Sequence, residues 1–131
     1  MANETALLAL LESQEAEASE RLPRVLKVIQ LLQQHRGLSS GVLNGNEAMK
    51  DKRAAKEKEV VEAVVAADAS LSPALRENQI WKSVRQDWEE IRAQGLSWSG
   101  PDNIKRHTQM IAKALQFMAE VADANNLTLD P

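Results

Sequence analysis

The sequence predicts an all-α fold, and three observations lead to that prediction. Aromatic residues make up only 3% of the 131 residues, and tyrosine is absent. The chain is rich in alanine, leucine, glutamate, lysine and glutamine, which favour helices over strands. Apolar residues recur at alternating intervals of four and three, the pattern of helices with one buried face. A chain of this length buries one core, so we expect residues 1–131 to form a single domain.

Three turn signals divide the chain into helices. The triplet Asn44-Gly45-Asn46 combines residues that tolerate the left-handed conformation with an asparagine suited to cap the next helix. Ser72 is a typical N-cap, and Pro73 fits the first helical position, where its missing N–H costs nothing. The stretch 95–101, which contains glycine, serine and proline, provides the third connection.

Four helices are therefore predicted, at about 4–44, 46–70, 73–94 and 102–126. The first helix is long and contains Pro23, and a proline inside a helix can bend the helix at that point. Because short connections place sequential helices antiparallel, the expected architecture is an up-down-up-down four-helix bundle.

Composition excludes several classes of function. A formal net charge of −3 argues against a nucleic-acid partner, which would require a surplus of lysine and arginine. The absence of cysteine excludes disulfides, a thiolate nucleophile and cysteine-ligated metals. The longest apolar run near the start, Ala6 to Leu11, is too short for direct membrane insertion. We therefore expect a cytoplasmic protein, although an excised periplasmic domain would have the same composition.

An arginine interrupts the apolar stripe of the first helix. The predicted stripe consists of Val25, Ile29, Leu32, Arg36, Ser39 and Leu43. The stripe of the second helix also begins with cations and then becomes apolar, through Met49, Arg53, Lys56, Val60, Val64, Ala67 and Leu71. Arg36 lies eight residues before Asn44, and Arg53 lies eight after Gly45. An antiparallel hairpin therefore places both arginines roughly 12 Å from the turn.

The remaining helices add an aromatic residue and a histidine at the same level. The third helix is expected to turn Trp81, Val84, Trp88 and Ile91 inward, and the fourth Ile104, His107, Thr108, Ile111, Leu115 and Met118. The bundle then gathers one cationic layer, composed of Arg36, Arg53, Trp88, His107 and either Ser39 or Ser40. Buried cations need a counter-ion, a carboxylate from outside these stripes, or water. A small planar anion would match the forked donors of a guanidinium.

Each of these residues also has a purely structural interpretation. The arginines can extend their charged ends to solvent while their stems pack. His107 can be a satisfied core histidine, and the tryptophans can be simple core residues. Gly37 and Gly41, four residues apart, indicate close helix approach, either within the bundle or across a dimer.

The run from Ile29 to Asn46, IQLLQQHRGLSSGVLNGN, resembles a known segment of sensor proteins. Bacterial nitrate- and nitrite-sensing domains, and related helical sensor domains of chemoreceptors, kinases and antiterminators, open with Q-x-x-R-G-hydrophobic-S. Further segments resemble their W-x(6)-W stretch and their H-T-x-x-I…V-A-D…L-x-L-D-P run, namely Trp81 with Trp88, His107-Thr108 with Ile111, Val121 to Asp123, and Leu127 to Pro131. Together these segments cover most of the chain.

The resemblance implies a helical signal-input module in which Arg36 contacts a small anion such as nitrate or nitrite. Arg53, His107, Ser40 and Trp88 are the further ligand-binding candidates. The family domain typically contains two bundles in tandem, whereas this sequence covers one. Three alternatives follow: a homodimer supplies the second bundle, the sequence is part of a longer protein, or the ligand is different. Signalling would also require an output protein or an output domain.

Two other classes of function remain open. A histidine phosphocarrier exposes a histidine near lysine, glycine and serine, and His35 is followed by Gly37, Ser39 and Ser40, although the lysine is missing. A plain interaction module would use the glycines for packing and Arg36 for a partner's carboxylate. We expect no enzyme activity, no cofactor and no metal. A di-iron bundle needs Glu-x-x-His pairs, but Leu32 and Ile104 precede the two histidines by three residues.

Overall fold

The structure, a computed structural model, describes the backbone of residues 2–129 and the side chains of residues 4–9 and 18–124. Its elements in chain order are α1 (Ala2–Leu43), α2 (Met49–Ser70), α3 (Pro73–Arg76), α4 (Gln79–Gln94), the 3-10 helix η1 (Gly95–Ser97) and α5 (Gly100–Leu129). Residues 2–129 contain no strand, which confirms the all-α prediction. The side chains of the Leu127 to Pro131 run quoted above lie outside the described residues.

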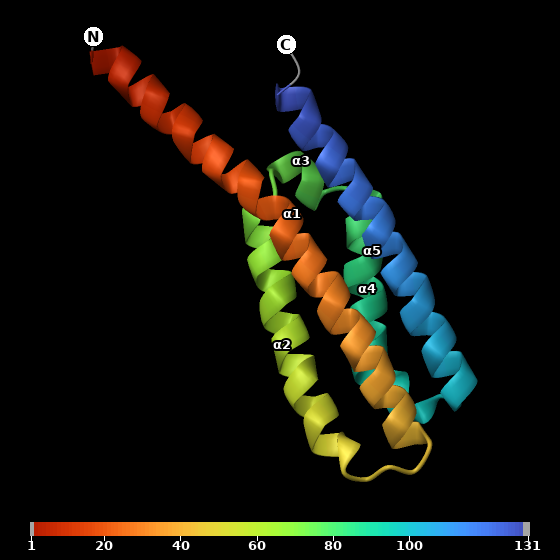
Figure 1. The fold of residues 1–131 in the computed structure, drawn as a ribbon. Helices are drawn as coiled ribbons and strands as arrows, with labels where there is room; N and C mark the ends of the chain where they lie inside the picture. Colours follow the sequence, from red (N-terminus) through yellow and green to blue (C-terminus); the bar gives the residue numbers. More distant parts are fainter. Residues whose placement is uncertain (1, 130–131) are drawn as a thin grey trace.

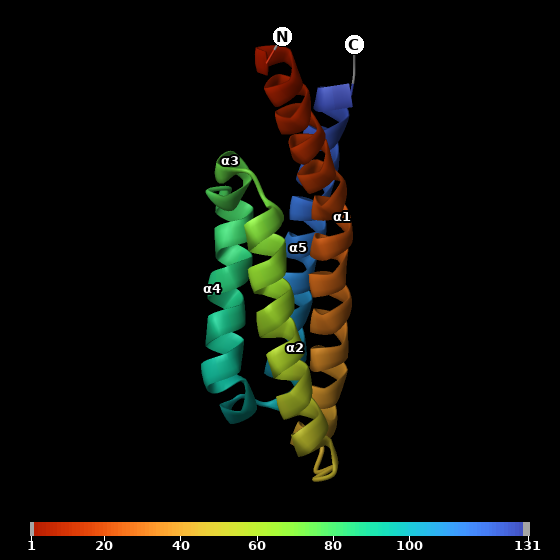
Figure 2. The same ribbon diagram turned by 90° about the vertical axis from the view of Figure 1, so that its left-hand side faces the viewer.

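The four long helices lie side by side. Figure 1 shows α1 descending from the N-terminus, α2 returning beside it after a turn, α4 descending and α5 ascending, so that both ends of the chain are on one side. Helix α1 packs against α2 and α5, and α4 packs against α5. Figure 2 shows α4 alongside α2. Ion pairs between long side chains span this seam, including Arg85–Asp68 at 3.5 Å and Arg92–Glu57 at 3.7 Å.

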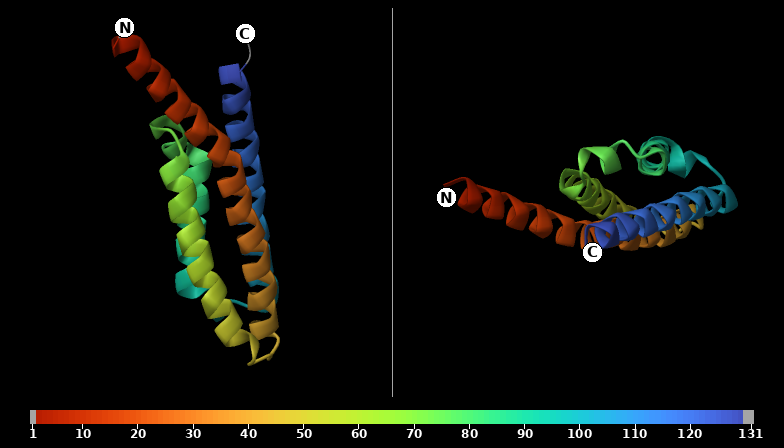
Figure 3. Two further views of the ribbon diagram at one scale, coloured as in Figure 1. Left: turned by 60° about the vertical axis from the view of Figure 1, so that its left-hand side comes forward. Right: turned by 90° about the horizontal axis from the view of Figure 1, so that it is seen from above.

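Helix α1 is continuous, with Pro23 inside it. Figure 3 shows that the first part of α1 turns away from the direction of the rest and extends beyond α2. The bend agrees with the expectation for a helix-internal proline, which removes one backbone hydrogen bond and crowds the preceding turn. None of the helices in residues 2–129 is long and apolar enough to cross a membrane.

The connection between α1 and α2 is the predicted turn. Gly45 adopts a φ of +96°, a conformation that favours glycine. Gly41 lies where the two helices meet, because a Cβ atom there would overlap the flexible end of the Met49 side chain on α2. Gly37, in contrast, is exposed and faces open space. The close-approach hypothesis therefore applies to Gly41, within the hairpin.

The prediction of one helix over 73–94 is wrong, because Asn78 interrupts it. Ser72 caps α3 as expected by accepting a hydrogen bond from the Leu75 N–H at 3.3 Å. Asn78 Oδ1 then accepts from the N–H groups of Ile80 at 2.9 Å and Trp81 at 3.2 Å. This second N-cap starts α4. The sequence analysis missed it because the apolar periodicity alone does not register a side-chain cap.

The core lies between α1, α2, α4 and α5. Among the described side chains, 17 buried apolar ones form this core, including those of Trp81, Trp88, Ile91 and Phe117. The inward face predicted for α4 is confirmed, since Trp81, Val84, Trp88 and Ile91 are all buried. The face predicted for α5 is partly wrong: Ile104 and Leu115 are 41% and 45% exposed. The buried side of α5 instead runs through Asn103, His107, Met110, Ile111, Ala114, Phe117 and Val121.

Candidate functional site

Near the α1–α2 turn, polar side chains replace the apolar core. We call this set the polar layer, and it consists of His35 and Ser39 of α1, Arg53 of α2, Trp88 of α4, and Asn103 and His107 of α5. Five of the six are 0–2% exposed, and Arg53 is 7% exposed. All four long helices therefore contribute to one buried polar cluster.

A chain of hydrogen bonds crosses the polar layer. His107 Nδ1 lies 2.8 Å from the backbone oxygen of Asn103. His107 Nε2 lies 2.8 Å from His35 Nδ1, which is also 3.5 Å from the hydroxyl of Ser39. Arg53 Nε donates to that same hydroxyl at 2.7 Å. The guanidinium of α2 is thereby connected to the histidine of α5 through two side chains of α1.

Four buried atoms of the polar layer have no hydrogen-bond partner within the described part of the chain: His35 Nε2, Arg53 Nη2, Trp88 Nε1 and Asn103 Oδ1. Leaving a polar atom unpaired in a protein interior costs about 1–3 kcal/mol. Native structures contain few such atoms, and a cluster of them calls for an explanation by a ligand, an ion or water. Two of the four are donors, on the arginine and the indole.

The layer carries a positive charge without an opposing carboxylate in contact. Arg53 forms no ion pair among the described side chains, and burial lowers its pKa while nearby Glu57 raises it. Burial, followed by the positive charge of Arg53 and the neighbouring His107, lowers the pKa of His35 to about 3. Burial also lowers the pKa of His107, against the hydrogen bond to Asn103. Both histidines are therefore neutral near pH 7, and Arg53 is the charged member.

The aromatic ring of Trp88 packs directly on this cluster. Its centroid lies 4.9 Å from that of His35, with the two rings nearly perpendicular at 80°. Backbone from η1 closes another side, because a Cβ atom on Gly95 would come within 3.3 Å of both Arg53 Nη2 and Asn103 Nδ2. Asn103 Nδ2 donates to the Gly95 carbonyl at 2.8 Å. The connection between α4 and α5 thus encloses one side of the polar layer.

The structure brings together three of the five predicted site residues, Arg53, Trp88 and His107. Arg36 lies at the edge, half-buried, with Nη1 donating to Thr108 Oγ1 at 3.1 Å. Ser40 is half-buried toward the turn, 3.5 Å from Asn44 Nδ2. The prediction that Arg36 interrupts the inward stripe is therefore wrong by one residue. His35 takes that position.

The sequence analysis missed His35 and Asn103 as layer residues. A second series in α1, Val25, Val28, Leu32, His35 and Ser39, has the same alternating spacing as the predicted one, and all five members are buried. On α5, the signal was the four-residue spacing of Asn103 and His107, which allows a histidine to donate to a backbone oxygen one turn earlier.

Both histidines of the chain are buried in the polar layer. Among the described side chains, no group of three or more histidine, aspartate and glutamate residues could hold a metal ion. The phosphocarrier alternative requires a histidine that a donor protein can reach, whereas His35 is 0% exposed beneath Trp88 and His107. This geometry argues against phosphotransfer through His35.

No family model, curated protein or solved structure matches the chain. The resemblance to nitrate- and nitrite-sensing domains therefore depends on the residues quoted for it.

Proposed function

We propose that this chain is a non-enzymatic signal-input domain that binds a small anion, such as nitrate or nitrite, in the polar layer. The observation that carries the proposal is the buried guanidinium of Arg53, which forms no ion pair among the described side chains and has an unpartnered Nη2 atom. A buried cation without a carboxylate in contact is costly, since Glu57 acts on Arg53 only from a distance, and a bound anion would remove much of that cost.

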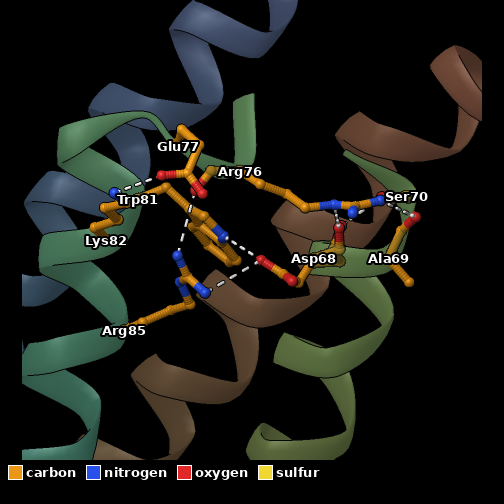
Figure 4. A network of polar contacts seen from close by, with 9 residues as sticks. Asp68, Ala69, Ser70, Arg76, Glu77, Trp81, Lys82 and Arg85 are labelled. Carbon is orange, nitrogen blue, oxygen red and sulfur yellow. Dashed lines mark hydrogen bonds and ion pairs between the residues drawn. The ribbon is translucent and has the colours of Figure 1, made fainter. Parts of the chain in front are cut away.

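A second polar network in the same molecule supports the proposal. At the other end of the α2–α4 seam, Trp81 Nε1 donates to Asp68 Oδ1 at 2.9 Å, and Arg85 pairs with the same carboxylate at 3.5 Å (Figure 4). The polar layer presents the same two donor types, from Trp88 and Arg53, without a carboxylate. A planar anion would fill the role that Asp68 has in the other network.

The flanking residues have secondary roles in this proposal. Arg36 is half-buried at the edge of the polar layer, where its charge would attract an anion before the anion reaches Arg53. His107 would hold the neighbouring histidine in position, and Ser40 would line the approach from the turn. This assigns the main contact to Arg53 instead of Arg36.

Transmission would use the long helices. The proposed architecture is an antiparallel up-down-up-down four-helix bundle in which anion binding displaces α2 and α4, whose seam is spanned by long side chains. Because α2 packs on α1 and α4 packs on α5, this displacement would shift α1 and α5 as well. Helices α1 and α5 both extend from the polar layer to the opposite end of the molecule, where they diverge (Figure 1). An output protein or output domain would respond there.

A homodimer is part of the proposal, and an outer groove fits it. The groove has a volume of about 390 Å³ and is lined by Arg24, Lys27 and Leu31 of α1 and by Glu59, Glu62, Ala63 and Ala66 of α2. One wall is basic and the other acidic. A two-fold axis that runs parallel to the groove and above it would place α1 of each protomer over α2 of its partner. The basic wall of one protomer would then face the acidic wall of the other, and the alanines permit close approach.

The test is calorimetric titration of the chain with nitrate and with nitrite. We expect wild type to bind at least one of them and Arg53→Met to weaken binding at least about thirtyfold, because truncating a buried charge contact typically costs 2 kcal/mol or more. Arg36→Met should weaken binding less than about fivefold, as expected for an edge charge. Lys105→Met, which removes an exposed cation of α5, is the matched control. Absence of heat for both anions, or unchanged binding in Arg53→Met, would contradict the proposal.

A further inference from the structure

The hydrogen bonds of the polar layer fix which ring nitrogens carry protons. The backbone oxygen of Asn103 can only accept, so His107 Nδ1, at 2.8 Å, is the donor. A neutral His107 then has a bare lone pair on Nε2. Because His35 Nδ1 lies 2.8 Å from that lone pair, His35 must also carry its proton on Nδ1. The remaining nitrogen, His35 Nε2, is left without a proton.

His35 Nε2 is buried and has no partner in the described part of the chain. The groups around this histidine are the hydroxyl of Ser39 on its own helix, the cation of Arg53 on α2, the ring of Trp88 on α4 and the neutral His107 on α5. Arg36 lies beyond His107, and Glu57 acts on Arg53. No carboxylate is within ion-pair distance of the histidine pair among the described side chains, so Arg53 is the dominant charge nearby.

The lone pair on the unprotonated Nε2 of His35 would repel the electron-rich oxygen atoms of an anion. Nitrate and nitrite offer only acceptor atoms, which suits the donors Arg53 Nη2 and Trp88 Nε1 but not the unprotonated Nε2 of His35. Protonation converts Nε2 into a third donor. The anion would offset the charge of Arg53, and the added proton would then give the layer two positive groups around one negative ligand.

We propose that anion binding in the polar layer is coupled to the uptake of one proton from solvent by His35 Nε2. The inference rests on the proposed anion-binding function and specifies its regulation: the fraction of the domain that binds anion depends on both the anion concentration and the pH. Before an anion binds, burial and the charge of Arg53 keep His35 neutral, and its pKa is about 3. The negative charge of the anion opposes the effects of burial and of Arg53 and raises that pKa, so the proton enters with the ligand.

The expected signature is a pH-dependent affinity for nitrate, whose own charge does not change between pH 6 and 8. For uptake of one proton, the dissociation constant rises by up to about tenfold for each unit of pH increase. Nitrate titrations should be run with the full chain at pH 6.0, 7.0 and 8.0 at constant ionic strength. At pH 7.0 they should be repeated in two buffers of different ionisation enthalpy, because proton uptake adds the heat of buffer ionisation to the signal.

The variant His35→Gln separates proton uptake from binding, since glutamine supplies an amide donor that does not titrate. We expect it to bind nitrate with a dissociation constant that is independent of pH. A measurement on wild type covers the case in which the variant fails to fold: long-range ¹H–¹⁵N NMR spectra should show His35 Nε2 becoming protonated on addition of nitrate.

The outcomes distinguish the two proposals. Nitrate binding with equal heats in both buffers, no pH dependence and an unprotonated Nε2 would overturn the proton coupling and leave anion binding intact. Absence of nitrate and nitrite binding at every pH would overturn the proposed function and this inference with it.

Discussion

Trp81 Nε1 lies 2.9 Å from Asp68 Oδ1, whereas the equally buried indole of Trp88 donates to no atom in the described part of the chain. The two tryptophans are seven residues apart on the same face of α4, so their backbone settings are alike. They differ in the acceptor available to the indole. Under the proposed function, Trp81 stabilises the fold and the indole of Trp88 is available to the anion.

Exchanging each tryptophan for phenylalanine should therefore have opposite effects. Trp81→Phe removes the indole donor to Asp68, a half-buried carboxylate that keeps its ion pair with Arg85, and we expect a loss of about 1 kcal/mol in the free energy of unfolding with nitrate binding unchanged. Trp88→Phe removes an unpaired donor, so its loss of stability should be smaller, while nitrate affinity should fall about tenfold. Urea unfolding and calorimetry on both variants measure the two effects. Equal destabilisation together with equal nitrate affinity would contradict the assignment.

The two buried histidines should both be found in the Nδ1–H tautomer. In water the Nε2–H form of neutral histidine is the more common one, but here the Asn103 carbonyl accepts from His107 and so determines both rings. Long-range ¹H–¹⁵N NMR at pH 7.5 in the absence of nitrate distinguishes the tautomers directly. A protonated Nε2 on His107 would contradict this assignment, because His107 would then donate to His35 Nδ1 instead of accepting from it.

Stability should fall as the solution is acidified below neutrality. Burial lowers the pKa of both His35 and His107 in the folded state, to about 3 for His35, whereas in the unfolded chain both titrate near 6.5. The unfolded state therefore binds protons first as the pH falls, and stabilisation present above pH 6.5 is progressively lost down to about pH 3. His35 should contribute about 1 kcal/mol to the loss between pH 7.0 and 5.5, and His107 should add to it in the same direction.

Urea unfolding at these two pH values, without added anion, checks this expectation. The variant His107→Gln should lose the contribution of one histidine and show a correspondingly smaller pH dependence. A free energy of unfolding that is the same at pH 7.0 and 5.5 would show that the folded state takes up protons as easily as the unfolded chain.

The groove between α1 and α2 leads to a charge-reversal experiment. Lys27 and Glu62 lie on its opposite walls, so reversing Lys27 alone would place like charges together twice in a two-fold dimer. We expect Lys27→Glu to weaken dimerisation about tenfold by sedimentation equilibrium, and the double variant Lys27→Glu/Glu62→Lys to restore it. Lys105→Glu makes the same charge change outside the groove. A wild-type chain that sediments as a monomer at all concentrations tested would exclude this dimer.

The buried face of a helix was predictable wherever only one series of apolar residues fitted the helical spacing. On α4, Trp81, Val84, Trp88 and Ile91 leave no other inward face, and all four are buried. On α1, two series share Val25, Leu32 and Ser39 and differ by one residue in between. Val28 and Ile29 are both buried, so apolarity at that turn did not distinguish the series. Two turns later the two series differ again, at His35 and Arg36. The prediction placed Arg36 on the buried face, whereas the structure buries His35.

The polar layer was predicted in location but not in composition. Counting residues from the turn correctly placed Arg53, Trp88 and His107 at one level of the molecule. Which atoms of these residues find partners was beyond sequence reasoning, because it depends on ring orientation and on distances of a few tenths of an ångström. The bond between His35 and His107 joins residues 72 positions apart, and no local pattern encodes it.

Helix α5 continues from His107 to Leu129, which at 1.5 Å per residue is about 33 Å of rigid rod. A tilt of only about two degrees where His107 meets His35 would move the far end of such a rod by about 1 Å. The distance between the end of α5 and the N-terminal part of α1, which diverges from α5 there, would change by a similar amount. In the proposed function, an output protein or output domain would respond to this distance.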